Sequence, residues 1–158
     1  MSDAVERVVF DCNIFAQTLI TPSGNAGKCV ERVLEGTVSL FWSEYVLGEI
    51  RRISEKPTPK RLGASPDQVE RLIARLIPLV HLVENPPSVY HHPIDPKDSH
   101  YVDLAVACSA KLIVSRDRHL LDLMNLSKPG AREFQSRFPG FSVLQPEGLL
   151  QLIQKSAP

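Results

Sequence analysis

The sequence predicts an α/β protein with three layers, in which helices cover both faces of a mostly parallel central sheet. Short apolar runs rich in β-branched residues alternate along the chain with segments of helical periodicity. Such alternation is typical of strands joined by helical crossovers. The chain has 158 residues, 43% hydrophobic and 23% charged, a composition that excludes disorder and suffices for one buried core. We therefore expect a single domain over residues 1–158, with its core over about residues 7–150.

The expected strands and helices follow one another without an internal repeat. Strands are expected at the short apolar runs 7–10, 38–42, 80–83, 112–115 and 141–144. Helices are expected over residues 13–20, 26–35, 44–55, 66–77, 96–109, 119–125 and 146–154. Ser43 is a suitable N-cap, Pro66 lies near a helix start, and Gly36 ends a helix. Residues 85–93 contain three prolines and are expected to form a connector.

Charge and cysteine content indicate a soluble cytoplasmic protein. Eighteen Lys and Arg balance eighteen Asp and Glu, so no global basic field points to nucleic acid, although a local basic rim can suffice. Three widely spaced cysteines without a C-x-x-C motif are typical of reduced thiols in the cytosol. The first ten residues do not resemble a signal peptide, and the apolar stretches are too short to span a membrane. We expect no membrane partner.

Two aspartates lie at the carboxyl ends of expected strands. Asp11 directly follows the run 7–10, and Asp117 follows the run 112–114 after two residues. Residues just past the carboxyl ends of parallel strands converge on one crevice, where ligands usually bind. Because two carboxylates there repel each other unless a cation lies between them, this pair is the first candidate for a metal site.

Two further acids are predicted on helices. Glu49 falls within the apolar arc of helix 44–55, where a charge is costly to bury unless it is paired or bound to metal. Glu49 could instead extend to solvent at the edge of the arc or pair with an arginine. Asp98 shares the apolar face of helix 96–109, whereas Asp103 points away. Alternatively, Asp95 is the N-cap of this helix, followed by a proline, and Asp98 interacts favourably with the helix dipole in the first turn.

The combination of these acids predicts a chemistry. Four carboxylates without histidine or thiolate at motif spacing suit a hard cation, Mg²⁺ or Mn²⁺, rather than zinc. Such ions favour phosphate substrates, because they activate water and stabilise the leaving oxygen. The implied reaction is hydrolysis of a phosphodiester bond.

Four segments of the sequence resemble a known family. They are VVFDCNIF, SEYVLGEI, DPKDSHYVDLAVACSAKLIVSRDRHLL and VLQPEGLL, in that order from about residue 7 to 150. Together they resemble the PIN domain, in particular the toxin subfamily of the PilT amino-terminal type, the VapC-like ribonucleases. The resemblance implies a catalytic and metal-binding centre of Asp11, Glu49, Asp98 and Asp117. It also implies supporting roles for Asn13, Ser43, Ser115 and Asp95, with an outer or capping position for the last.

The resemblance further implies what the protein does and with what. It predicts a Mg²⁺- or Mn²⁺-dependent endoribonuclease that cleaves single-stranded or structured RNA, as the toxin of a type II toxin–antitoxin pair. An antitoxin partner would insert a segment into or beside the acidic crevice, and a homodimer is expected. Cys12, Arg116 and His100 replace the threonine, glycine and lysine common in the family, and none of these changes removes a carboxylate.

Basic residues near the acids are candidates for contacts to RNA. Arg116 and Arg118 flank Asp117, and Arg52 belongs to a basic cluster near the helix of Glu49. The members of that cluster are Arg51, Arg52, Lys56, Lys60 and Arg61.

Other interpretations remain at this point. The chain could be a non-catalytic PIN-fold module that binds RNA or protein, or a structure-specific DNA nuclease, although it lacks the extra length such nucleases usually carry. The segment GNAGKC lacks two residues of a phosphate-binding P-loop and is expected to be a turn opening a helix. We expect His91 and His92, beside Pro93, to lie in a solvated loop.

Overall fold

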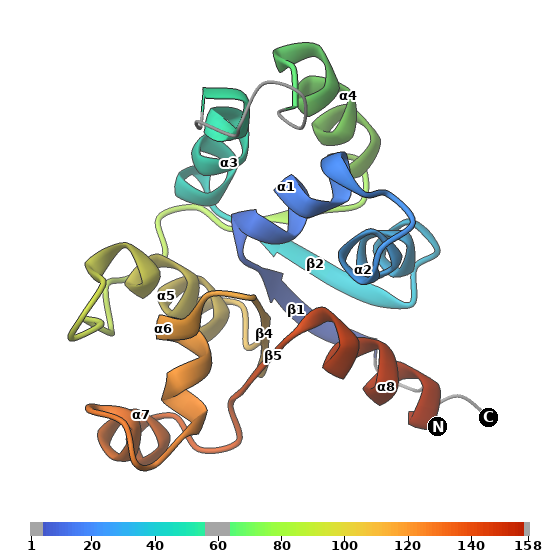
Figure 1. Cartoon of the computed structure of the whole chain (residues 1–158). Helices are drawn as coiled ribbons and strands as arrows, with labels where there is room; N and C mark the ends of the chain where they lie inside the picture. Colours follow the sequence, from blue (N-terminus) through green and yellow to red (C-terminus); the bar gives the residue numbers. More distant parts are fainter. Residues whose placement is uncertain (1–4, 56–63, 157–158) are drawn as a thin grey trace.

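A computed structural model describes residues 5–55 and 64–156 of the chain (Figure 1). Its five strands form one sheet in the order β3-β2-β1-β4-β5, and every neighbouring pair is parallel. The strands are β1 (Glu6–Phe10), β2 (Val38–Trp42), β3 (His81–Leu82), β4 (Leu112–Val114) and β5 (Ser142–Leu144). The predicted α/β class with a mostly parallel sheet is confirmed.

Helices cover both faces of the sheet. The α-helices are α1 (Cys12–Ile20), α2 (Asn25–Leu34), α3 (Glu44–Arg51), α4 (Pro66–Leu76), α5 (Ser99–Ala107), α6 (Arg118–Leu121), α7 (Ala131–Arg137) and α8 (Pro146–Ser156). Helix α2 contacts both α1 and α8 on one side of the sheet, while α5, α6 and α7 lie on the other (Figure 1). Because both faces are covered, β1 and β4 are continuously apolar where they pair.

Three of the expected helices are composite. The segment 44–55 is α3 followed by the 3-10 turn η1 (Arg52–Glu55), and 119–125 corresponds to α6 followed by η3 (Asp122–Met124). The segment 96–109 begins with the 3-10 turn η2 (Pro96–Asp98), after which α5 starts at Ser99. Short 3-10 turns are frequent at helix termini, where they satisfy backbone groups that the α-helical pattern leaves free.

The predicted capping residues lie where the sequence indicates. The Oγ atom of Ser43 accepts a hydrogen bond from the backbone N–H of Val46 at 3.3 Å and caps α3. Gly36 adopts a positive φ of 80° after α2, a conformation that favours glycine. In the GNAGKC segment, a Cβ on Gly27 would collide with the carbonyl oxygen of Pro22, so this glycine serves close packing.

The sequence did not predict helix α7. It has only seven residues and starts after Gly130, which has a φ of 79°. The signal was the spacing of Ala131, Phe134 and Phe138, since the first two are buried and Phe134 contacts the ring of Phe138.

The core is one apolar cluster around the central strands. Phe15 of α1 packs between Phe10 of β1 and Trp42 of β2, with ring centroids 5.9 and 5.7 Å away. Within the described part of the chain, the three cysteines are buried thiols. Over the same residues, no helix has both the length and the apolar character that crossing a bilayer requires.

Candidate metal centre

The carboxyl ends of β1 and β4 define the place of the site. These strands are neighbours, but the chain leaves β1 into α1 on one face of the sheet and β4 towards α6 on the other. Such a topological switch opens a crevice outside the strand ends, the usual ligand position in α/β sheets. The N–H of Asp11 donates to the carbonyl of Val114 at 2.9 Å, which places Asp11 beside Ser115.

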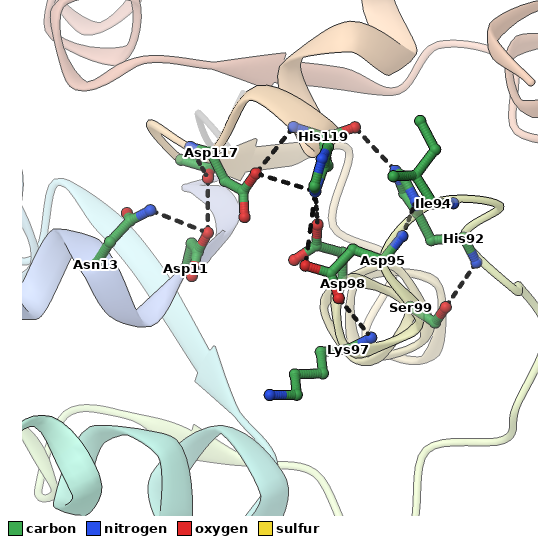
Figure 2. Close-up of polar contacts among 11 residues, drawn as sticks. Asp11, Asn13, His92, Ile94, Asp95, Lys97, Asp98, Ser99, Asp117 and His119 are labelled. Atoms are coloured by element: carbon green, nitrogen blue, oxygen red, sulfur yellow. Dashed lines mark hydrogen bonds and ion pairs between the residues drawn. The ribbon is translucent and has the colours of Figure 1, made fainter. Parts of the chain in front are cut away.

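Ser115 links the two strand-end aspartates. Its Oγ donates to Oδ2 of Asp11 at 2.7 Å and accepts from the N–H of Asp117 at 2.8 Å. Asn13, the predicted ordering residue, donates to the same Asp11 oxygen at 3.2 Å (Figure 2). Asp11 is 4% exposed and Ser115 is fully buried, so these bonds fix the orientation of the Asp11 carboxylate.

Asp117 also belongs to a second group, in which three aspartates and one histidine converge (Figure 2). Each of Asp95, Asp98, Asp117 and His119 offers one ligand atom, and these four atoms lie within 4.8 Å of one another. We call these four residues the acidic centre. From Nδ1 of His119, the distances to carboxylate oxygens are 3.6 Å to Asp95, 3.8 Å to Asp117 and 3.9 Å to Asp98.

Two of the aspartates also cap helical turns. Oδ1 of Asp95 accepts from the N–H of Lys97 at 3.2 Å, as the alternative interpretation expected, and Oδ1 of Asp117 accepts from the N–H of His119 at 2.8 Å. Asp98 makes no such side-chain bond at the start of α5. Its residue is 5% exposed, and its Oδ2 is buried without a hydrogen-bond partner among the described residues. Capping therefore does not explain the position of the Asp98 carboxylate.

The crowding of carboxylates disfavours their ionised forms. Burial, the largest cause, and the charges of Asp117, Asp95 and Asp11 together raise the pKa of Asp98 to about 8. Burial and the charge of Asp117 also raise the pKa of Asp11, against the opposing effect of its hydrogen bond from Ser115. Within the described residues, no lysine or arginine forms an ion pair with these aspartates. A divalent cation fits this donor set, because it would neutralise the repulsion and give Asp98 Oδ2 a partner.

His92 holds the connector against the site, and its predicted solvated position was wrong. The residue is 5% exposed, and its Nδ1 accepts the backbone N–H groups of Ile94 and Asp95 at 3.1 and 3.0 Å. Since Nδ1 accepts two bonds, the ring proton is on Nε2, which donates to the carbonyl of His119 at 2.9 Å. His92 thus ties the turn of Asp95 to the turn of His119. His91 is exposed, as expected.

Helix α5 anchors the same connector. Oδ1 of Asp103 accepts from the N–H groups of Val89 and Tyr90 at 2.9 and 3.0 Å, and Ser99 Oγ accepts from the N–H of His92 at 2.7 Å. Asp103 lies away from the acidic centre, as predicted, but it is buried and structural rather than solvated.

Glu49 lies outside the acidic centre as the structure describes it. Its Oε1 accepts from Arg52 at 2.7 Å, and its side chain is 20% exposed. This is the pairing with an arginine that the sequence left open. Burial and, to a smaller extent, the charges of Glu49 and Asp95 raise the pKa of Tyr45, so this ring lies within electrostatic range of both acids. The Tyr45 ring stacks on exposed His100 with centroids 3.5 Å apart.

The two arginines that flank Asp117 have different environments. Arg116 contacts Gln17 at 2.7 Å and pairs with Glu147 of α8, so it connects helices on one face of the sheet. Arg118 is exposed, and no ion pair involves it within the described residues. Of the remaining basic cluster, Lys56, Lys60 and Arg61 lie outside the described residues.

The sequence did not single out His119. The signal was its position two residues after Asp117, in the first turn of a helix that starts at a strand end. Its approach to Asp95 and Asp98 depends on the packing of the connector, which a local pattern does not encode.

An all-parallel α/β sheet with carboxylates at its switch point is the architecture of many proteins that bind metal and phosphate. Comparison with known proteins is more specific, since the PIN domain family matches residues 7–119. The chain belongs to the PIN domain family, whose members are typically metal-dependent nucleases.

Two relatives extend the comparison over most of the chain. An uncharacterized protein of Methanocaldococcus jannaschii is 23% identical over 146 residues, which cover 85% of this chain and 93% of that protein. The crystal structure of VapBC2 from Rickettsia felis, bound to a DNA fragment from their promoter, contains a chain of similar fold with a TM-score of 0.53. That match is 13% identical and covers 88% of this chain and 98% of the other.

Proposed function

We propose that the protein is a Mg²⁺- or Mn²⁺-dependent endoribonuclease and the toxin of a type II toxin–antitoxin pair. The observation that carries this proposal is the buried, partnerless Oδ2 of Asp98 among the carboxylates of Asp95 and Asp117. Membership of a family of nucleases and the fold shared with a chain of a VapBC complex support it.

Some residues would bind the metal ion, and others would orient these ligands. Asp95, Asp98 and Asp117, with Asp11 beside them, would hold the divalent ion, which when bound supplies charge neutralisation for an attacking water and a leaving oxygen. Ser115 orients Asp11 and fixes the backbone of Asp117. Glu49 would join this centre if its pairing with Arg52 opened. We expect in-line attack by water, without a covalent enzyme intermediate.

Substrate and partner contacts would lie around this centre. Exposed Arg118 is the first candidate to contact an RNA phosphate, because Arg116 is already engaged with Glu147. An antitoxin that masks the centre would place a basic side chain against its carboxylates, since these lack an arginine or lysine partner among the described residues. A homodimer is part of the same proposal.

The central test is RNA cleavage by purified protein and matched variants. Asp11→Asn and Asp98→Asn should each abolish cleavage of a single-stranded RNA with Mn²⁺ or Mg²⁺, and EDTA should abolish it for the unchanged protein. Asp67→Asn, an exposed acid at the start of α4, is the control and should cleave normally. Cleavage that survives Asp11→Asn or EDTA would contradict the proposal. The absence of both saturable Mg²⁺ binding and RNA cleavage would instead favour a non-catalytic binding module.

The toxin assignment needs its own test. Co-expression with the product of the reading frame immediately upstream should relieve growth arrest and inhibit the purified nuclease. Unchanged cleavage in the presence of that product would contradict the pairing while leaving the nuclease assignment intact.

A further inference from the structure

We propose that Nδ1 of His119 is itself a ligand of the metal ion, which makes the centre a mixed nitrogen and oxygen site that favours Mn²⁺ over Mg²⁺. The inference deepens the proposed function and rests on its metal dependence. It concerns a residue that the sequence did not single out.

The imidazole nitrogen of His119 that faces the carboxylates lacks a hydrogen-bond partner among the described residues. Nδ1 of His119 is buried and has no hydrogen-bond partner among the described residues, although three carboxylate oxygens lie 3.6 to 3.9 Å away. A buried polar atom without a partner destabilises the fold and calls for an explanation such as an ion. Asp98 Oδ2, in a residue 5% exposed, is partnerless in the same way and is 3.9 Å from this nitrogen. Two lone-pair donors without hydrogen-bond partners, one nitrogen and one oxygen, thus lie 3.9 Å apart.

The fold also fixes the position of His119. Its backbone N–H donates to Oδ1 of Asp117 at 2.8 Å, and its carbonyl accepts from Nε2 of His92 at 2.9 Å. His92 in turn uses Nδ1 to accept two backbone N–H groups, so neither of its nitrogens is available to a metal. Hydrogen bonds therefore fix both backbone groups of His119, and this positions its side chain at the acidic centre.

The spacing of the ligand atoms can be compared with that around a single octahedral ion. Ligands about 2.1 Å from an ion are about 3.0 Å apart when adjacent and about 4.2 Å apart when opposite in octahedral coordination. The distances from His119 Nδ1 to the three oxygens, 3.6, 3.8 and 3.9 Å, fall between these values. At most one of the three oxygens can lie opposite the nitrogen, so the other two would have to approach it by about 0.6–0.9 Å, a change that rotation of the side chains on both sides of the ion would supply.

The choice of ion follows from ligand chemistry. Mg²⁺ takes oxygen ligands and keeps water in preference to nitrogen, whereas imidazole nitrogen suits first-row transition metals. Three carboxylates retain affinity for Mn²⁺, the hardest of these metals. Replacing the imidazole by an oxygen donor should therefore weaken Mn²⁺ binding more than Mg²⁺ binding.

The test uses Mn²⁺ as a spectroscopic probe of the metal-free full chain. Pulsed electron paramagnetic resonance should detect ¹⁴N coupled directly to bound Mn²⁺, and labelling of the histidines with ¹⁵N should change the coupling frequency. His119→Gln should abolish the coupling and lower the ratio of Mn²⁺ to Mg²⁺ affinity about tenfold in calorimetry. His100→Gln, an exposed histidine of α5 outside the acidic centre, is the control and should leave both readouts unchanged.

Each outcome either supports or overturns the role of His119 as a metal ligand. Bound Mn²⁺ without nitrogen coupling in the unchanged protein overturns the role of His119, even if the His119→Gln variant fails to fold. That result leaves the proposed nuclease intact, because an all-oxygen site can still cleave RNA. A protein that cleaves no RNA but binds Mn²⁺ through nitrogen would contradict the proposed function and retain the inference.

Discussion

Replacement of Asp98 by asparagine should stabilise the metal-free protein at neutral pH. The carboxyl group of Asp98 is buried, its Oδ2 lacks a hydrogen-bond partner among the described residues, and three other aspartates surround it. These conditions raise the pKa of Asp98 from 3.8 to about 8 in the folded protein. Ionisation of this group therefore opposes folding, and an asparagine of the same shape removes the ionisation.

The sign and size follow from proton linkage. Between pH 5 and pH 7 the unfolded chain has released the Asp98 proton, while the folded protein, with a pKa of about 8, still holds it. The folded state binds more protons over this interval, so the contribution of Asp98 to the free energy of unfolding falls as pH rises. The slope is about 1.4 kcal/mol per pH unit, which gives at most about 3 kcal/mol over the two units. This contribution is largest below pH 4 and is lost by about pH 8, the reverse of a salt-bridged aspartate.

Urea unfolding in EDTA at pH 5, 6 and 7 measures this effect. Trp42 is the chain's one tryptophan and is fully buried, so its fluorescence reports global unfolding. The stability of Asp98→Asn relative to the unchanged protein should grow with pH, and Asp67→Asn should show no such trend. A difference that is constant from pH 5 to 7 would mean that the folded pKa of Asp98 lies below 5, and would refute the crowding on which the site rests. Added Mn²⁺ should reverse the order of stability at pH 7, because the ion binds only the chain with intact carboxylates.

Three other predictions address the frame of the site. Ser115→Ala should cost about 1–3 kcal/mol in urea unfolding, since it leaves the N–H of Asp117 without an acceptor and the buried Asp11 oxygen with only the bond from Asn13, and a loss below 0.5 kcal/mol would contradict the bridge. His92→Leu should cost about 2–3 kcal/mol because two backbone donors lose their acceptor, whereas His91→Leu should change stability by less than about 0.5 kcal/mol; equal losses would contradict the contrast. Arg118→Ala should weaken RNA binding in EDTA and reduce the salt slope by about 0.7, while Arg116→Ala leaves the slope unchanged. Equal slopes would refute that assignment.

The features that could be predicted from the sequence are those that depend on a local pattern of residues. Apolar runs of four or five residues indicate buried strands wherever both faces are covered, and Asp11 follows such a strand directly. Ser43 was predictable as a cap because N-capping depends on the identity of one residue at a helix start. Helix α7 was missed because seven residues with two buried side chains give a weak periodic signal.

The side-chain partners at the site were not predictable in the same way. A helical projection places Glu49 within the apolar arc but cannot decide whether its carboxylate binds a metal or pairs with Arg52, because the two outcomes differ only in the direction of the side chain. His92 and His119 acquire their positions from a connector that Asp103 anchors to α5. Each of these contacts joins segments that are distant in the sequence, so no local pattern contains them.

This division between pattern and packing explains how the chain tolerates its acidic centre. Three aspartates near one point oppose folding, and the energy must come from elsewhere in the domain. The hydrogen bonds of Ser115, His92 and Asp103 are buried or partly buried and engage backbone groups of the segments that carry the aspartates or lead to them. They hold the carboxylates close without neutralising them, which leaves their charge to a cation. A chain that relieved the repulsion with a lysine or arginine would be more stable when metal-free and would bind a metal less tightly.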